Sequence, residues 1–150
     1  MNGKSMAGSA IETTREAKVI GTLNEALGAW EARDAVAMMS YFAPSPTLVI
    51  YGTGADEKRI GLEEARYQAE RDFAQSESLG ATLDWNLVGI SGNVAWTASD
   101  VTIRFKAPGQ PEMQFPARLT TVLQEYDGRW LFEQFHLSVA ATGQEEGESF

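Results

Sequence analysis

The chain contains no cysteine, which excludes disulfide bonds, thiol catalysis and thiolate metal sites. It has one histidine, His136, and no tight cluster of carboxylates, so the sequence offers no recognisable metal site. No apolar run approaches the ~20 residues of a membrane-spanning helix. The first ten residues carry one lysine and no apolar stretch, unlike a secretory signal. We therefore expect a cytoplasmic protein that requires no metal or other cofactor.

Basic residues are also scarce, because 12 Lys and Arg stand against 21 Asp and Glu and give a net charge of -9. This charge argues against a nucleic-acid interface and against an anionic membrane surface, both of which normally need a basic face. The composition, 43% hydrophobic over 150 residues, is typical of a single globular domain with its own core. We expect residues 1–9 and 143–150 to be flexible ends of that domain.

Three helices are predicted in the first half of the chain. Ser9 and Glu12 fit a capping box, and apolar residues then recur on one helical face at Val19, Leu23, Leu27 and Trp30. A short second helix is predicted over residues 34–42 and ends before two prolines. A third helix is predicted over residues 62–75.

Five strands are predicted, one between the second and third helices and four after the third helix. They cover residues 47–51, 82–91, 94–106, 115–121 and 130–138. In each of the strands 82–91 and 94–106, the apolar residues occupy every second position, but partway along they switch from one face of the strand to the other. Such changes indicate two β-bulges and a strongly curved sheet. The alternative is a sheet that buries both faces at these positions.

The last two strands, joined around Asp127-Gly128, allow two registers. A two-residue turn would place Leu119 opposite His136, and a three-residue loop would place Arg118 opposite His136. The three-residue loop separates an apolar face from a mixed face, so we favour it. The mixed face would hold Arg118, Thr120, Val122, Trp130, Phe132 and His136. A surface this apolar should be covered by a ligand, a helix or another subunit, and a homodimer through the sheet face is the simplest arrangement.

The order of elements and several short motifs resemble the SnoaL-like family of the nuclear transport factor 2-like, cystatin-like cone fold. The motifs are Trp30 with Arg33-Asp34, residues 51–54, residues 92–96, residues 118–120, residues 127–130 and residues 136–138. The resemblance implies an α+β domain with three N-terminal helices packed on a strongly curved, mixed but mainly antiparallel sheet. It also implies an apolar pocket at the open end and, commonly, a dimer.

One departure from a related pattern limits the chemistry. Enzymes similar to ketosteroid isomerase place a catalytic aspartate in the strand after the second helix. The matching residues 47–51 contain no carboxylate, and the nearest acids are Asp56 and Glu57 beyond a glycine bend. The sequence therefore argues against isomerase chemistry of that kind.

The candidate catalytic residues are His136, Arg118 and Asp56. His136 could move a proton, Arg118 could hold or polarise an oxygen, and Asp56 could act at the pocket mouth. Each also has a structural alternative: a hydrogen-bonded histidine on a covered face, an arginine in an ion pair, and a turn or capping aspartate. The candidate ligand-binding residues are Trp30, Tyr51, Trp96 and Thr120. For the three aromatic residues, core packing is the alternative.

Two functions remain open at this stage. The first is a SnoaL-like protein that binds a small apolar or carboxylate-bearing molecule, with cyclase, isomerase or dehydratase chemistry of the acid/base type. The second is a non-catalytic dimerisation or ligand-sensing module, with Arg118 and His136 in the subunit interface. The position of these two side chains, in a cavity or on the dimer face, discriminates between the two functions.

Overall fold

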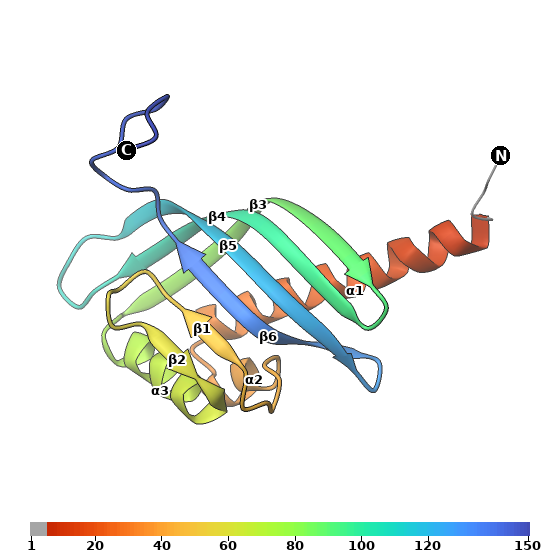
Figure 1. The fold of residues 1–150 in the computed structure, drawn as a ribbon. Helices are drawn as coiled ribbons and strands as arrows, with labels where there is room; N and C mark the ends of the chain where they lie inside the picture. Colours follow the sequence, from red (N-terminus) through yellow and green to blue (C-terminus); the bar gives the residue numbers. More distant parts are fainter. Residues whose placement is uncertain (1–5) are drawn as a thin grey trace.

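The computed structural model describes residues 6–150, with side chains from residue 14 onward. The elements are α1 (Met6–Glu31), α2 (Ala35–Met39), β1 (Val49–Tyr51), β2 (Lys58–Ile60), α3 (Gly61–Ala74), β3 (Ser78–Ser91), β4 (Val94–Lys106), β5 (Met113–Tyr126) and β6 (Arg129–Ser138). They form one six-stranded sheet in the order β2-β1-β6-β5-β4-β3, in which only β1 and β6 run parallel. Figure 1 shows α1 along one face of the sheet and α3 beside β1 and β2 at one end. The predicted α+β cone fold is confirmed.

The predicted helices are present, with different ends. Helix α1 already runs through Ser9, so the predicted capping box does not mark its start, and residues 6–9 are helical rather than a loose end. Residues 1–5 of the predicted flexible segment lie outside the described residues. Asp34 caps α2, because its Oδ1 accepts the backbone N–H of Ala37 at 3.0 Å. Strand β2 was missed because three residues are too few to show an alternating pattern.

The hairpin between β5 and β6 has a two-residue turn, so the predicted three-residue loop is wrong. Tyr126 pairs with Arg129, and Asp127 and Gly128 both have positive φ, 48° and 81°. A bulge then leaves Glu133 without a paired residue on β5. Beyond the bulge, His136 lies opposite Thr120, not opposite Arg118.

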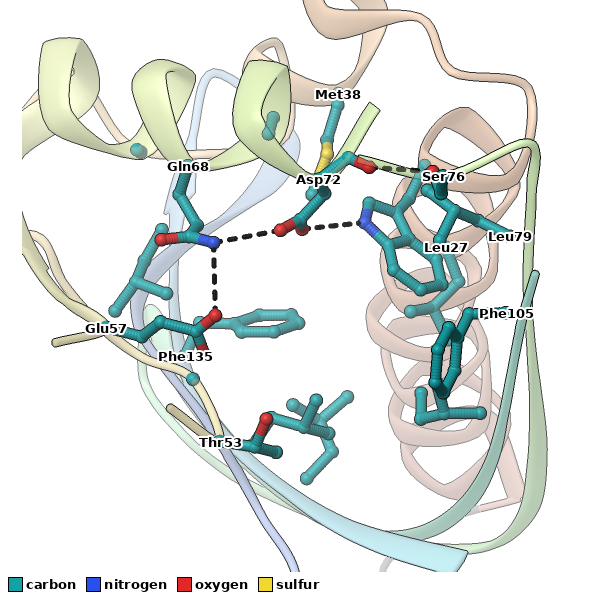
Figure 2. A pocket seen from close by; sticks show the side chains of 18 of the residues that line it. Leu27, Met38, Thr53, Glu57, Gln68, Asp72, Ser76, Leu79, Phe105 and Phe135 are labelled. Atoms are coloured by element: carbon teal, nitrogen blue, oxygen red, sulfur yellow. Dashed lines mark hydrogen bonds between the residues drawn. The ribbon is translucent and has the colours of Figure 1, made fainter. Parts of the chain in front are cut away.

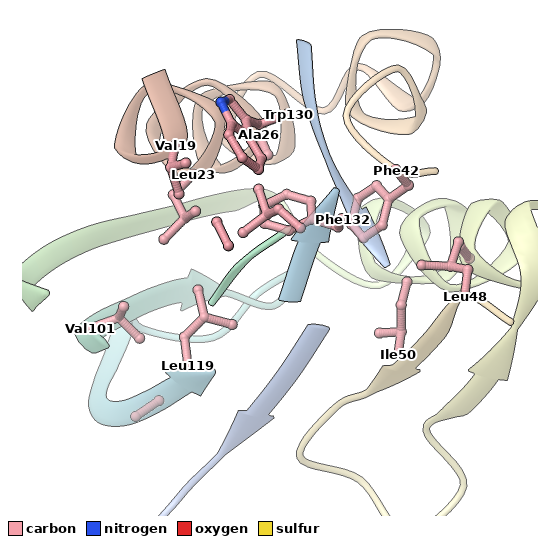
Figure 3. Close-up of a cluster of buried hydrophobic side chains, with 14 of the residues drawn as sticks. Val19, Leu23, Ala26, Phe42, Leu48, Ile50, Val101, Leu119, Trp130 and Phe132 are labelled. Carbon is pink, nitrogen blue, oxygen red and sulfur yellow. The ribbon is translucent and has the colours of Figure 1, made fainter. Parts of the chain in front are cut away.

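The two-residue turn sets the face of each β6 side chain before the bulge, and the bulge resets it for the residues that follow. Trp130 and Phe132, predicted on the mixed face, point to the helix side and are 2% and 0% exposed. Figure 3 shows them between α1, Phe42 and the sheet. Backbone hydrogen bonds from the Phe132 N–H to the Tyr41 carbonyl and from the Ala43 N–H to the Phe132 carbonyl, both 2.8 Å, fix this segment against the end of α2. The predicted apolar surface built on Trp130 and Phe132 is therefore wrong, and these rings form the core instead.

Only one of the two predicted bulges in β3 and β4 is present. The β3–β4 register shifts between Leu83 and Trp85, whereas β4 pairs with β5 without interruption. The prediction of a bulge in β4 was wrong because the buried face of this strand carries the polar Thr97 and Ser99, while its exposed face carries Trp96. The Trp96 indole lies over Gly89, where an added Cβ would be 2.2 Å from the ring. The apolar residues of β4 thus switch faces because both faces of this strand carry apolar side chains, not because the strand has a bulge.

Candidate functional site

The structure holds a cavity of about 540 Å³ between α1, α3 and the helix-facing side of the sheet. This volume lies within the range of small-molecule sites in proteins. Exposed Thr53 and Gln75 are among its lining residues, so the cavity can be reached from solvent. The lining residues are Leu27, Trp30, Met38, Met39, Phe42, Ile50, Tyr51, Gly52, Thr53, Glu57, Ala65, Gln68, Ala69, Asp72, Gln75, Ser76, Leu79, Val101, Ile103, Phe105, Ala107, Phe115, Leu119, Phe135 and Leu137.

Most of this lining is apolar, and five of its polar residues gather on the α3 side: Glu57, Gln68, Asp72, Gln75 and Ser76. Figure 2 shows Asp72 projecting from α3 between Gln68 and an indole ring, that of Trp30. The Trp30 Nε1–H donates to Asp72 Oδ2 at 3.1 Å, and Gln68 Nε2 donates to Asp72 Oδ1 at 2.8 Å. Two neutral donors thus hold the Asp72 carboxylate in one orientation at the cavity wall.

The spacing along α3 explains why Asp72 lies at the cavity. Ala65, Gln68, Ala69 and Asp72 are separated by three and four residues, so they share one helical face. The two alanines are buried and short, which leaves open space where larger side chains would fill the core. Arg33, at φ 60°, then ties the end of α1 to the end of α3, because its guanidinium donates to Ser76 Oγ at 2.9 Å.

The loop between β1 and β2 is anchored to α3 by Glu57. Glu57 Oε2 accepts the Gly54 N–H at 2.7 Å, and Glu57 Oε1 accepts from Arg71 Nη2 at 3.1 Å and from Gln68 Nε2 at 3.3 Å. Asp56 lies beside it but outside the lining, where it forms an ion pair with Arg71 at 2.6 Å. The hydrogen bond from Arg71 lowers the pKa of Asp56. Asp56 therefore serves as a loop anchor in this structure and not as a group at the pocket mouth.

Burial raises the pKa of Asp72 above its usual value. The hydrogen bonds from Trp30 and Gln68 act in the opposite direction, the charge of Glu57 also raises this pKa, and the charge of Arg71 lowers it. Since burial dominates, Asp72 holds its proton more tightly in the folded chain than in the unfolded chain.

A raised pKa predicts the sign of a pH effect on stability. The folded state loses stability as pH rises from the ordinary carboxyl value of 3.8 through the folded-state pKa of Asp72, because the unfolded chain releases this proton first. Asp72→Asn removes that loss and keeps the side-chain shape. We expect the stability of the variant relative to wild type to increase as pH rises across that window, measured by urea unfolding at a series of pH values. A difference that is constant, or that decreases with pH, would contradict the account.

Two of the predicted ligand-binding residues, Trp30 and Tyr51, belong to the cavity lining, and the other two do not. The ring of Tyr51, however, lies against His136 on the outer face, so of the two aromatic side chains only that of Trp30 is placed to contact a ligand. Arg118, Thr120, His136 and Trp96 lie on the opposite, outer face of the sheet. Arg118 Nη2 donates to the Val139 carbonyl at 3.1 Å and its side chain is exposed. The His136 ring lies beside that of Tyr51, with centroids 5.0 Å apart. The expectation that Arg118 and His136 lead the pocket chemistry has no support in this geometry.

The outer face has a smaller hollow of about 360 Å³. Trp96 and Thr120 line it together with Leu87, Thr97, Ala98, Thr121, Val122 and Gln134. Trp85, Leu87 and Trp96 are 52%, 63% and 51% exposed, so this face is apolar in the single chain. The predicted homodimer through this face stays a prediction.

Sequence reasoning missed Asp72, Gln68 and the role of Glu57. A usable signal was present, since Gln68 and Asp72 occupy the same helical stripe as two alanines. Polar residues on the inward stripe of an amphipathic helix, next to residues too small to fill the core, indicate a polar group facing a cavity.

Among the side chains of residues 14–150, no group of three or more His, Asp or Glu is placed to hold a metal ion. Over the same part of the chain, no helix has the length and hydrophobicity needed to cross a membrane.

A model of the SnoaL-like domain matches residues 19–142, which is most of the chain. The chain belongs to the SnoaL-like domain family. A search of curated protein sequences finds no match to this SnoaL-like domain. Residues 19–142 include Trp30, Glu57, Gln68 and Asp72, so the cavity with its polar end lies inside the matched region.

Solved structures similar to this SnoaL-like domain share its fold at low identity. A nuclear transport factor 2-like superfamily protein from Salmonella enterica is 17% identical with a TM-score of 0.80, over 91% of this chain and 99% of that chain. A candidate dehydratase of the same superfamily from Streptomyces avermitilis is 18% identical with a TM-score of 0.80, over 86% and 99%. A candidate scytalone dehydratase from Novosphingobium aromaticivorans is 9% identical with a TM-score of 0.80, over 89% of both chains. At these identities the likeness shows the fold alone.

Proposed function

We propose that this SnoaL-like domain binds one small, mostly apolar organic molecule in the 540 Å³ cavity, and that Asp72 exchanges a proton with it. The observation that carries the proposal is a half-buried carboxyl, held by Trp30 and Gln68, at the polar end of an otherwise apolar cavity. A carboxyl whose pKa is raised by burial holds a proton more readily than an ordinary surface carboxyl and is a candidate for acid/base catalysis.

Acid/base chemistry of this kind covers isomerisation, cyclisation and dehydration, the reactions considered from the sequence. Two structural neighbours carry names of candidate dehydratases, and a dehydration needs a group that can accept or donate a proton. The proposed proton carrier is Asp72, in place of His136.

A ligand-sensing function without turnover uses the same cavity. It is favoured by one observation, that the single histidine and Arg118 lie on the opposite face and leave Asp72 without a second catalytic partner of either type. Both functions require the cavity to bind a ligand, so binding is the property to test first.

The test is a titration with N-phenyl-1-naphthylamine, an uncharged probe whose fluorescence rises in apolar surroundings. We expect saturable binding of one probe per chain. The double variant Arg118→Ala, His136→Ala should bind within about twofold of wild type, since surface changes away from a site alter energies little. Absence of saturable binding, or its loss in the double variant, would contradict the proposal.

A further inference from the structure

The charged residues that line the larger cavity are all acidic. Two acids, Glu57 and Asp72, line the cavity, and none of its lining residues is Lys, Arg or His. The nearby arginines contact lining residues without lining the cavity themselves: Arg71 binds Glu57, Arg59 binds Gln68 Oε1 at 3.0 Å, and Arg33 binds Ser76. The side chains that line the cavity are therefore acidic or uncharged, and the nearby arginines lie outside the lining.

The two acids differ in how their charge is balanced. Glu57 forms an ion pair with Arg71 at 3.1 Å and accepts a backbone N–H from Gly54. Asp72 takes part in no ion pair among the described residues, and its carboxylate partners are the neutral indole of Trp30 and the neutral amide of Gln68. The cavity thus has one carboxylate without an ion-pair partner in the described part of the chain.

We infer that the ligand carries a single protonated amine on an apolar body, with the ammonium against Asp72 and the body against the apolar wall. This inference rests on the proposed function of the same cavity, with Asp72 in its ionised, proton-accepting form. Burying an ammonium costs free energy unless it is paired, and Asp72 supplies the pair. The rings of Trp30 and Phe135 in the wall add faces that attract cations.

The same charges disfavour the carboxylate-bearing ligand that the sequence allowed. A ligand carboxylate would lie near Asp72 and Glu57, and like charges at close range are repelled. Arg118, the side chain expected to hold such a carboxylate, is on the other face of the sheet.

The geometry also implies a pH dependence of binding. The groups that face the Asp72 carboxyl are Trp30 from α1, Gln68 and Arg71 from α3, and Glu57 from the β1–β2 loop. Acid that protonates Asp72 removes the partner of the ammonium, so amine binding should weaken as pH falls toward and below the pKa of Asp72. A neutral ligand of the same size should not show this loss.

The test uses three naphthalene probes of nearly equal size: 1-naphthylmethylamine, 1-naphthalenemethanol and 1-naphthoate. Each competes with N-phenyl-1-naphthylamine in the full chain. We expect the amine to bind at least about tenfold more tightly than the carboxylate, with the alcohol between them. Asp72→Asn should weaken amine binding by about tenfold and leave alcohol binding within about twofold.

The matched control is Asp56→Asn, which removes the same charge from an exposed side chain outside the cavity and should leave the order of the probes unchanged. Equal affinities for the three probes, or tightest binding of naphthoate, would overturn the inference that the ligand is an amine. The proposal that the cavity binds a ligand would still stand in that case, provided that N-phenyl-1-naphthylamine binds. No binding of any probe would overturn both. If Asp72→Asn does not fold, the pH dependence of amine against alcohol binding in wild type decides the same point.

Discussion

Phe132→Ala should lower the free energy of unfolding by about 3–5 kcal/mol, the range for removing a fully buried aromatic side chain. Phe132 is 0% exposed and lies at the centre of the core. Its ring packs against Phe42 and Phe135, with centroids 5.0 and 5.2 Å away. Loss of the ring leaves a cavity that the surrounding backbone, hydrogen-bonded to Tyr41 and Ala43, can close only in part.

The control is Trp96→Ala, which removes a larger ring from the exposed face of the same sheet. Trp96 is 51% exposed, so we expect its replacement to cost less than about 1 kcal/mol in the single chain. Urea unfolding of both variants measures the difference. Equal losses, or a smaller loss for Phe132→Ala, would show that β6 does not have the register described here.

The second large effect concerns the cavity itself. Ala69→Leu should weaken binding of N-phenyl-1-naphthylamine at least about tenfold, because the new side chain fills space that the ligand needs. Ala69 is 2% exposed and lines the cavity from α3, opposite the sheet. Ala107→Trp, at a half-buried position of the same lining, provides a second way to fill the cavity if Ala69→Leu is overpacked.

The matched control places the same substitution in the other hollow. Ala98 lines the 360 Å³ hollow on the outer face, so Ala98→Leu fills that hollow and should leave probe binding within about twofold. Fluorescence titrations of variants that keep a cooperative unfolding transition give the comparison. Binding lost in Ala98→Leu and retained in Ala69→Leu would move the ligand site to the outer face.

The fold could be predicted from the sequence because the order of helices and strands follows from hydrophobic patterns that extend over many residues. The apolar periodicity of α1, the breaks at Pro44 and Pro46, and the four long strands each extend over many residues, so an error of a few residues at an end changes nothing in the architecture. The resemblance to the SnoaL-like family depended on the same order of elements, and the family match confirms it.

The candidate site was harder to predict because it depends on single residues. The two-residue turn decides that Phe132 points inward, and one unpaired residue after it, Glu133, decides that His136 lies opposite Thr120. Beyond this bulge, the β6 residues were predicted on the correct faces of the sheet. Before it, Trp130 and Phe132 were predicted on the wrong face. Asp72 was missed because charged helix residues are usually exposed, and only the packing of α3 against Trp30 shows that this one is not.

The most direct test of the central claim, that the ligand binds on the helix side of the sheet, uses the four tryptophans. Trp30 lines the cavity, Trp130 is in the core, and Trp85 and Trp96 are on the outer face. Their four indole N–H signals in a heteronuclear NMR spectrum can be assigned with Trp→Phe variants and followed during titration with 1-naphthylmethylamine. The account predicts a saturable shift of the Trp30 signal while the Trp85 and Trp96 signals stay in place. A shift of Trp85 or Trp96 with Trp30 unmoved would contradict it.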